Sequence, residues 1–313
     1  MTDAGWGLCT YRDTTSADGV EALGALRHAD GAVVAVPGPP YRGLMDAMAE
    51  WDALAQRLQG WDPTGLPAVP DVTLLAPLRF PRKVICTGVN YGSHVAEMGA
   101  GRPSPGWEAW FFLKPPTTTI IGPDAAIEID PDRDERVDWE GELGIVIGRG
   151  GRAIRAADAA DHVAGFTVVN DVSARGPHRR TEAPHDAFRY DWLASKAQDT
   201  FCPMGPAVTP RWLLPDPNPQ RLRLWVNDVL KQDEQAGAML VGWRELVEAA
   251  SARITLEPGD VIAAGTPAGV GAPRAEFLRP GDVVRVEIDG LGSLRNPVVA
   301  RTAAAAPLVR RTA

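Results

Sequence analysis

The segment Asp138-Trp-Glu-Gly-Glu-Leu-Gly-Ile-Val-Ile147 has the side-chain alternation that is typical of a β-strand. Successive side chains of a strand point to opposite faces, so Glu140 and Glu142 share one face and Leu143 lies on the other. Two carboxylates on one strand face usually belong to a solvated surface, and the pair alone favours a half-buried strand. A third carboxylate nearby would instead favour a metal site.

Asp171 is the candidate third carboxylate, because it ends the apolar run Phe166–Asn170. An ionised carboxylate where a buried strand meets a loop is costly unless it is paired or bound to a metal. Three carboxylates suit Mg²⁺, Mn²⁺ or Ca²⁺ rather than zinc. The three cysteines lack metal-ligand spacing and are expected to be reduced thiols. Taken alone, Asp171 is equally compatible with a turn or N-cap residue.

From Arg82 onward, short β-rich runs interrupted by Gly and Pro predict a β-rich α+β fold. The expected strands are Val84–Thr87, Glu142–Ile147, Phe166–Val172, Leu222–Val226, Val261–Ala264 and Val283–Ile288. The expected helices are Ala156–Val163, which Gly165 would terminate, and Gly242–Ala252.

The first eighty residues predict a small N-terminal α/β domain. Val33–Val36 is expected to form a strand, and Tyr41–Gln59 carries the apolar stripe of an amphipathic helix. The proline-rich stretch Trp61–Pro81 is incompatible with regular helix and suits an extended connector. We therefore expect an N-terminal domain over residues 1–80, a catalytic domain over 81–302 and a tail over 303–313.

The composition excludes several classes of protein. The chain has 313 residues and a net charge of −8, which argues against nucleic acid as a partner. No stretch of 18 apolar residues predicts a membrane span, and the start of the chain lacks a secretory signal, so a cytoplasmic location is expected. Lysine is scarce: the four lysines are Lys83, Lys114, Lys196 and Lys231, against 28 arginines.

His94 and Glu97 are three residues apart and would face each other on one helical turn. Such a carboxylate can orient the imidazole as a general base. The spacing is equally compatible with an exposed helical pair that has no catalytic role. Residues 99–105 are rich in Gly and Pro, so the more specific hypothesis is a mobile lid that carries the base.

Lys114 and Lys196 lie in motif-like surroundings, where an ammonium beside a metal could stabilise an enolate or a substrate carboxylate. The alternative for Lys196 is a structural ion pair with Asp199. Thr266 lies in the glycine-rich turn 264–271, which could present its hydroxyl and backbone amides to an anionic group.

The order of these motifs from Val84 through Asn296 resembles the catalytic domain of the fumarylacetoacetate hydrolase family. The motifs are Gly88-Val-Asn-Tyr91, His94 with Glu97, Phe112-Leu-Lys114-Pro115, Asp138–Leu143, Val168–Arg175, Lys196 with Asp199–Pro206, Leu256–Val261 and Gly265–Pro267. The resemblance implies a mixed β-sandwich or roll, and homodimers. The preceding region is similar to members with an N-terminal extension.

The resemblance also implies roles for individual residues. A divalent cation, Mg²⁺ or else Mn²⁺ or Ca²⁺, would lie on Glu140, Glu142 and Asp171. His94 and Glu97 would form a lid dyad that activates water or moves a proton, with Lys196 as a third catalytic residue. The implied substrate-binding residues are Tyr91, Lys114, Arg175, Gln232 and Thr266.

Members of the family act on short oxo-acids, and a metal stabilises the enolate that forms. The first hypothesis is C–C bond hydrolysis of an acylpyruvate-type β-diketo acid. The second is isomerisation or decarboxylation of a 2-hydroxy-dienoate or oxo-diacid. A non-catalytic metal and carboxylate binder is the third, and it would have little use for the His94/Glu97 dyad.

The sequence departs from the family pattern after Arg175. Relatives usually continue with Asp and soon a Gln, whereas here Gly176-Pro-His-Arg-Arg180 leads into a polar insertion that ends at Asp191. The insertion either accommodates a larger or more anionic substrate or is an exposed loop. Gln232 is present, but the Asn-Thr pair that commonly follows is absent.

Overall fold

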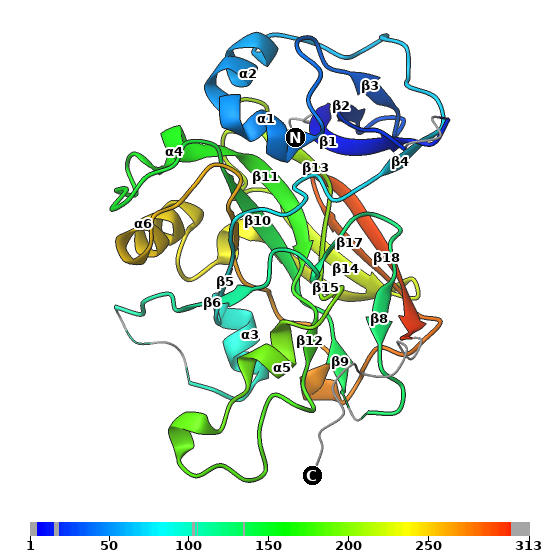
Figure 1. Ribbon diagram of the computed structural model, residues 1–313. Helices are drawn as coiled ribbons and strands as arrows, with labels where there is room; N and C mark the ends of the chain where they lie inside the picture. Colours follow the sequence, from blue (N-terminus) through cyan, green and yellow to red (C-terminus); the bar gives the residue numbers. More distant parts are fainter. Residues whose placement is uncertain (1–4, 16–18, 102–103, 105, 134, 302–313) are drawn as a thin grey trace, which may run out of the picture.

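An 11-stranded sheet runs through the molecule, which we describe from a computed structural model (Figure 1). The structure describes residues 5–15, 19–101, 104, 106–133 and 135–301. The main path of the sheet is β3-β2-β1-β13-β11-β10-β16-β5-β6, with β4 paired to β1 and β7 paired to β13. The bounds are β1 Trp6–Asp13, β2 Glu21–Arg27, β3 Val33–Ala35, β4 Val72–Leu74, β5 Val84–Thr87, β6 Phe111–Lys114, β7 Ile120–Ile121, β10 Gly141–Ile147, β11 Val163–Asn170, β13 Cys202–Pro210 and β16 Val261–Ala263.

A second sheet packs against the middle of the first and closes the core. Its order is β15-β14-β17-β18-β8, and β9 and β12 form a separate pair. The bounds are β8 Ile127–Ile129, β9 Val137–Asp138, β12 Ser173–Ala174, β14 Arg221–Val226, β15 Val229–Gln235, β17 Val283–Ile288 and β18 Gly292–Ala300. The shared core includes Leu143, Ile145, Phe166 and Val168 from the first sheet and Leu222, Leu224, Val284 and Val286 from the second.

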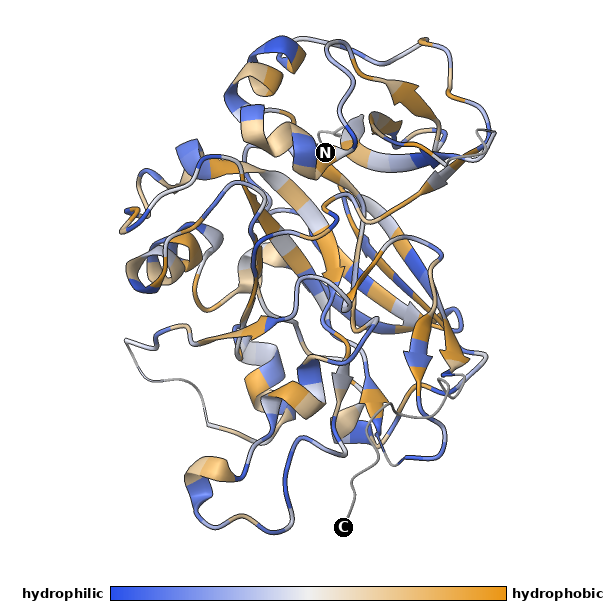
Figure 2. Cartoon of the chain, in the orientation of Figure 1, coloured by the Kyte–Doolittle hydropathy of each residue, from blue (hydrophilic) through white to orange (hydrophobic). Residues whose placement is uncertain are grey.

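The helices are short and few among the described residues, which confirms the β-rich α+β class. They are α1 Leu44–Ala47, η1 Met48–Glu50, α2 Trp51–Leu58, α3 Gly92–Glu97, α4 Ala159–His162, η2 Asp186–Phe188, α5 Trp192–Lys196, η3 Ala236–Ala238, α6 Trp243–Arg253 and η4 Ala272–Arg274. Figure 2 shows hydrophobic and hydrophilic residues interspersed around α6. Its buried side chains, among them Trp243 and Leu246, face the core, and the helix expected over Gly242–Ala252 is confirmed to within one residue at each end.

The N-terminal elements gather at one end of the molecule (Figure 1) but share sheet and core with the rest. Leu8 of β1 pairs with Val208 of β13. Leu54 of α2 belongs to the same buried cluster as Val146 of β10. The boundary at residue 80 stays a prediction, and the predicted tail over 303–313 lies outside the described residues.

Two predicted helices and one predicted helix end differ from the structure. The helix expected over Ala156–Val163 is only the single turn α4. Gly165 does not terminate it but lies inside β11, where a Cβ atom would be 2.1 Å from the carbonyl oxygen of Thr209 in β13. The helix expected over Tyr41–Gln59 is divided by η1 into α1 and α2. Gly165 is therefore a glycine because two strands approach closely, not because a helix ends.

Each of the four lysines forms an ion pair with a carboxylate. Lys83 pairs with Glu257 and Asp260, and Lys231 pairs with Glu276. The exposed fraction of the lysine side chains is at most 19%. Lys114 and Lys196 are the two most buried, and both contact Asp171.

Within the described residues, no helix is both long enough and apolar enough to cross a membrane.

Candidate active site

The three acidic residues lie together at the edge where β10 begins and β11 ends. They are Glu140, Glu142 and Asp171. The two strands are antiparallel and Gly141 pairs with Asn170, so the register brings the flanking carboxylates to the same edge. One ligand oxygen from each of the three lies within 4.8 Å of the others. The exposed fractions are 6%, 1% and 1%, so the solvated-face interpretation of the two glutamates is wrong.

Glu140 and Asp171 form ion pairs with protein cations, whereas Glu142 forms none within the described residues. Burial, then the negative charges of Asp171 and Glu140, hold the pKa of Glu142 well above its usual value. Burial acts in the same direction on Glu140, but Lys196 and Arg175 outweigh it and lower the pKa of that carboxyl. Three converging carboxylate oxygens, one of them on a residue without a cationic partner, fit a hard divalent cation such as Mg²⁺, Mn²⁺ or Ca²⁺.

Lys196 bridges two members of the triad. Its Nζ lies 2.8 Å from Oε2 of Glu140 and 2.7 Å from Oδ2 of Asp171. Burial lowers the pKa of Lys196, but the two carboxylates outweigh burial and raise it, so the ammonium stays charged. The predicted alternative, an ion pair with Asp199, is not what the structure shows.

Lys114 is a second lysine that contacts Asp171. Its Nζ contacts Oδ1 of Asp171 and donates to the carbonyl oxygen of Val172 at 2.9 Å. These contacts fix the orientation of the Asp171 carboxylate, and the interpretation of Asp171 as an N-cap is wrong.

Arg175 is held by a carboxylate that sequence reasoning did not assign. Its Nε donates to Oδ2 of Asp138 at 3.0 Å, and its Nη2 donates to Glu140 at 2.5 Å. Asp138 also accepts from the amides of Gly271 and Ala272, at 2.6 and 3.0 Å. Asp138 thus ties the loop near Thr266 to the start of the triad segment. The sequence showed a carboxylate beside a tryptophan, but Arg175, Gly271 and Ala272 lie more than 30 residues away from it.

The His94/Glu97 dyad forms on α3, as predicted. Nδ1 of His94 lies 2.7 Å from Oε1 of Glu97, and Oε2 of Glu97 accepts from the amide of Gly269 at 2.9 Å. Because the Glu97 carboxylate accepts a hydrogen bond from Nδ1–H, Nε2 is the nitrogen left to act as a base. His94 is only 7% exposed, so the exposed-pair interpretation is wrong. Residues 102, 103 and 105 of the proposed lid loop lie outside the described residues, and closure stays a prediction.

A pocket of about 250 Å³ joins the dyad to the triad. It is lined by Thr87, Gly88, Val89, His94, Met98, Trp110, Phe112, Glu140, Glu142, Arg175, His178, Trp192, Lys196 and Thr266. A base, an ammonium and two carboxylates therefore face one small volume, which is the arrangement needed to move a proton on a bound acid.

Of the five predicted substrate-binding residues, Arg175 and Thr266 line this pocket and the other three do not. Gln232 donates to Oγ1 of Thr266 at 2.8 Å and accepts from the amide of Gly141 at 2.9 Å. The hydroxyl of Tyr91 donates to a backbone carbonyl at 3.2 Å. Tyr91, Lys114 and Gln232 hold neighbours of the pocket in place, and substrate contact by them stays a prediction.

The insertion between Pro177 and Asp191 contributes one residue, His178, to the pocket. Its cations are largely paired within the loop: Arg180 with Asp191 at 2.5 Å, and Arg189 with Asp186. The loop therefore adds an imidazole to the pocket rather than a patch of free positive charge.

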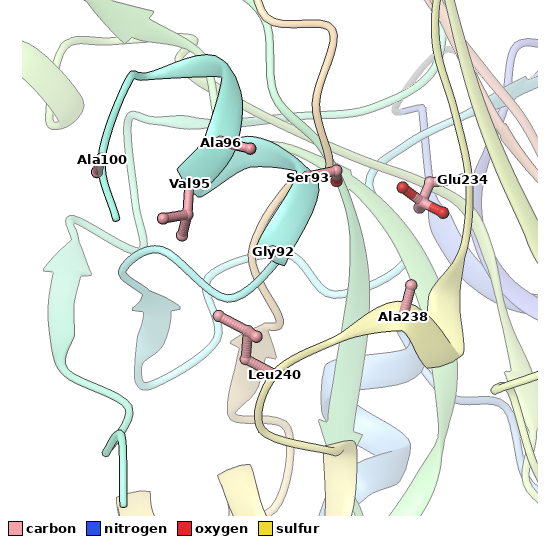
Figure 3. Close-up of a pocket in the computed structure, with 8 residues that line it drawn as sticks. All are labelled: Gly92, Ser93, Val95, Ala96, Ala100, Glu234, Ala238 and Leu240. Carbon is pink, nitrogen blue, oxygen red and sulfur yellow. The ribbon is translucent and has the colours of Figure 1, made fainter. Parts of the chain in front are cut away.

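A larger cavity of about 430 Å³ is lined by other residues of α3 (Figure 3). Figure 3 shows Ser93, Val95 and Ala96 of α3 near Leu240, with Glu234 beyond Ser93. Among the described residues that line this cavity, Glu234 is the only titratable one. The chemistry is thus concentrated in the smaller pocket.

The family model for the fumarylacetoacetate (FAA) hydrolase C-terminal domain matches residues 83–299. The chain belongs to the fumarylacetoacetate hydrolase family. The resemblance that the motifs predicted is confirmed, and the FAH-type fold agrees with the solved structures of family members.

The relatives of this family member are enzymes. A Xenopus laevis protein named oxaloacetate tautomerase fahd2, mitochondrial, is 42% identical over 231 residues, which cover 73% of this chain and 69% of that protein. A 5-carboxymethyl-2-hydroxymuconate delta-isomerase from Mycobacterium smegmatis is 34% identical, with a TM-score of 0.71 over 95% of this chain and 99% of that one. Maleylpyruvate hydrolase from Sphingobium sp. SYK-6, solved with manganese (II) ion and pyruvate, is 28% identical, with a TM-score of 0.71 over 95% of this chain and 100% of that one.

Proposed function

We propose that this protein is a divalent-metal-dependent enzyme that hydrolyses a C–C bond in a short acylpyruvate-type β-diketo acid. The observation that carries the proposal is the shared pocket: His94, oriented by Glu97, faces the same volume as Glu140, Glu142 and Lys196. A base and a buried ammonium beside an acidic triad are what enolate chemistry requires.

The residues that would hold the cation are Glu140, Glu142 and Asp171. When bound, the cation would act as a Lewis acid that stabilises the negative charge of an enolate. The maleylpyruvate hydrolase relative, with its manganese and pyruvate, supports Mg²⁺ or Mn²⁺ at this position and an oxo-acid as ligand.

The protein side chains perform the proton transfers. Glu97 holds the Nδ1 proton of His94, so Nε2 takes a proton from a water molecule whose oxygen attacks the distal acyl carbonyl carbon. The C–C bond between that carbon and the neighbouring methylene then breaks, and its electron pair passes to the pyruvate fragment as an enolate. The ammonium of Lys196 lowers the energy of this anion. Return of the proton from His94 to the methylene carbon gives pyruvate.

The second candidate is isomerisation or decarboxylation of an oxo-acid by the same groups. The 42% identity to an oxaloacetate tautomerase favours the keto–enol version. In that reaction His94 moves a proton between carbon and oxygen, and no water attacks.

The test is turnover of a substrate panel by the purified protein. Acetylpyruvate, oxaloacetate and a hydroxymuconate-type diacid would be incubated with Mg²⁺, Mn²⁺ or EDTA in H₂¹⁸O, and the products identified by mass. Label in the acid product marks hydrolysis, CO₂ marks decarboxylation, and an enol absorbance change marks tautomerisation. Absence of any metal-dependent turnover would overturn the proposal.

The triad assignment has its own test. Glu142→Ala should abolish metal-dependent turnover and the heat of Mn²⁺ binding in calorimetry. The matched control is Glu108→Ala, because the Glu108 side chain is 83% exposed and distant from the triad in sequence. An unchanged rate in Glu142→Ala contradicts the metal assignment.

We further propose that the enzyme is a homodimer, a proposal supported by the family membership. Light scattering should give twice the chain mass of 33.5 kDa. A monomeric mass would contradict it.

A further inference from the structure

The active-site pocket has two chemically different ends. Glu140, Glu142 and Lys196 form the polar end. The same lining includes four ring side chains, Trp110, Phe112, Trp192 and His178, together with Met98. We call the three rings of Trp110, Phe112 and Trp192 the aromatic surface.

The rings of the aromatic surface touch one another. The Trp192 and Phe112 ring centroids are 5.2 Å apart with the planes 28° from parallel, and the Trp110 and Trp192 centroids are 4.9 Å apart at 70°. The imidazole of His178 meets the Trp192 ring edge to face, with centroids 4.5 Å apart. Contacts of this kind fix ring orientation, so the wall is continuous and pre-formed.

The aromatic surface begins directly beside the polar end. Trp192 and Lys196 are four residues apart on α5 and so lie on the same side of that helix. The Nζ atom of Lys196 is 5.3 Å from the centroid of the Phe112 ring. A molecule held at the polar end therefore reaches the rings within a few bonds.

The Trp110 ring can occupy its position only because residue 88 is a glycine. A Cβ atom on Gly88 would lie 1.9 Å from the Trp110 ring, and the Gly88 amide donates to the Trp110 carbonyl at 2.8 Å. Gly88 of the Gly88-Val-Asn-Tyr91 motif thus leaves the space that the Trp110 ring occupies in the aromatic surface.

The cations that line the pocket are already engaged at its polar end. Arg175 pairs with Asp138 and Glu140, and Lys196 pairs with Glu140 and Asp171. Burial, then the charges of Arg175 and Lys196, lower the pKa of His178, and its Nδ1 is buried without a hydrogen-bond partner. A carboxylate at the aromatic end would lose its water without gaining a cation, which is costly.

We propose that the substrate carries an aromatic or planar conjugated group, rather than a second carboxylate, at the end opposite its 2-oxo-carboxylate, and that this group lies on the aromatic surface. An aroylpyruvate has this form. The inference rests on the proposed function and deepens it. In the corresponding reaction benzoylpyruvate and water give benzoate and pyruvate: the water oxygen enters benzoate, the C–C bond breaks, and the methylene carbon takes the proton.

The kinetic test compares benzoylpyruvate, acetylpyruvate and oxaloacetate with Mg²⁺. We expect kcat/KM for benzoylpyruvate to exceed that for the other two by roughly tenfold or more, as contact with an apolar wall allows. Trp192→Ala should lower kcat/KM for benzoylpyruvate by about tenfold and that for acetylpyruvate by less than about threefold. Trp192→Phe keeps an aromatic ring and should therefore retain most of the kcat/KM preference for benzoylpyruvate over acetylpyruvate.

Trp107→Ala is the matched control, because Trp107 is 38% exposed, close to the 36% of Trp192, but does not line the pocket. Far-ultraviolet circular dichroism would verify the fold of each variant. Equal loss for both substrates in Trp192→Ala would overturn the assignment of the aromatic surface.

A binding measurement separates this inference from the proposed function. In the His94→Ala protein with Mg²⁺, calorimetry should show tighter binding of benzoylpyruvate than of acetylpyruvate, whether or not the active enzyme turns either over. Equal or weaker binding of benzoylpyruvate would overturn the inference. Faster hydrolysis of acetylpyruvate than of benzoylpyruvate would also overturn it while leaving the proposed hydrolase function intact.

Discussion

His94 has one ring nitrogen engaged with Glu97 and is not among the residues that form the acidic triad. His94→Ala should therefore lower kcat by about 10²- to 10⁴-fold, the usual contribution of a general base, and leave the metal affinity unchanged. Stopped-flow or steady-state rates give the first quantity, and Mn²⁺ titration calorimetry gives the second. A parallel loss of rate and of affinity would mean that His94 is a ligand or a structural residue.

Gln232 connects the triad segment to the Thr266 loop through three hydrogen bonds, to Gly141, Thr266 and Pro267. Gln232→Leu has a similar size but leaves the buried Gly141 amide without a partner, which should cost about 1–3 kcal/mol of unfolding free energy. Urea denaturation measures the loss. Gln235→Leu in the same strand is the control, because Gln235 is exposed. Equal effects of the two changes would contradict the bridging role.

The residues of the triad and the dyad were predictable because each follows a local rule. Strand alternation placed Glu140 and Glu142 on one face, and helical spacing placed His94 opposite Glu97. The role of Asp138 and the aromatic surface could not be predicted. They depend on contacts between β6, α5 and loops that lie tens of residues apart, for which sequence periodicity carries no signal.

At the scale of a secondary-structure element, β11 and β13 approach each other closely at Gly165. Gly165→Ala would place a methyl group 2.1 Å from the Thr209 carbonyl oxygen, so the strands must separate. We expect a destabilisation of about 1–3 kcal/mol, which is typical of overpacking, visible as a lower Tm in calorimetry. Gly101→Ala is the control, since nothing lies within 4 Å of its Cβ position. An unchanged Tm for Gly165→Ala would contradict the close approach.

Strands with continuous apolar runs were predicted to within a few residues, and β5 and β17 agree at both ends. The central strand β13 was missed because Cys202–Pro210 contains three prolines, which normally argue against a strand inside a sheet. β13 accommodates its prolines beside β11 with a register shift between Phe166 and Val168 of β11. The edge strand β15 was missed because most of its side chains are polar or exposed.

At the scale of the whole molecule, the three buried cysteines can show whether the chain unfolds in one cooperative step. Cys9 lies in β1, Cys86 in β5 and Cys202 in β13. Burial raises the pKa of Cys9 and of Cys202 to about 12 and that of Cys86 well above its usual value, so the reactive thiolate is scarce at pH 8. Because β1 and β13 belong to one sheet, we expect all three thiols to become reactive at the same urea concentration.

Alkylation at increasing urea, followed by peptide mapping, measures each thiol separately. Reaction of Cys9 at a clearly lower urea concentration than Cys86 and Cys202 would contradict the shared unfolding. That result would instead support an N-terminal domain that unfolds independently at the predicted boundary near residue 80.

The ion-paired lysines have a consequence for handling the protein. All four lysines and all three cysteines lie within the described residues, and the cysteines are buried while the lysine amines are held by carboxylates. Amine-reactive dyes, cross-linkers and sensor surfaces should therefore couple inefficiently to the lysine side chains of the folded protein. A single cysteine introduced on an exposed strand such as β15 would provide a site-specific attachment point with no competing surface thiol.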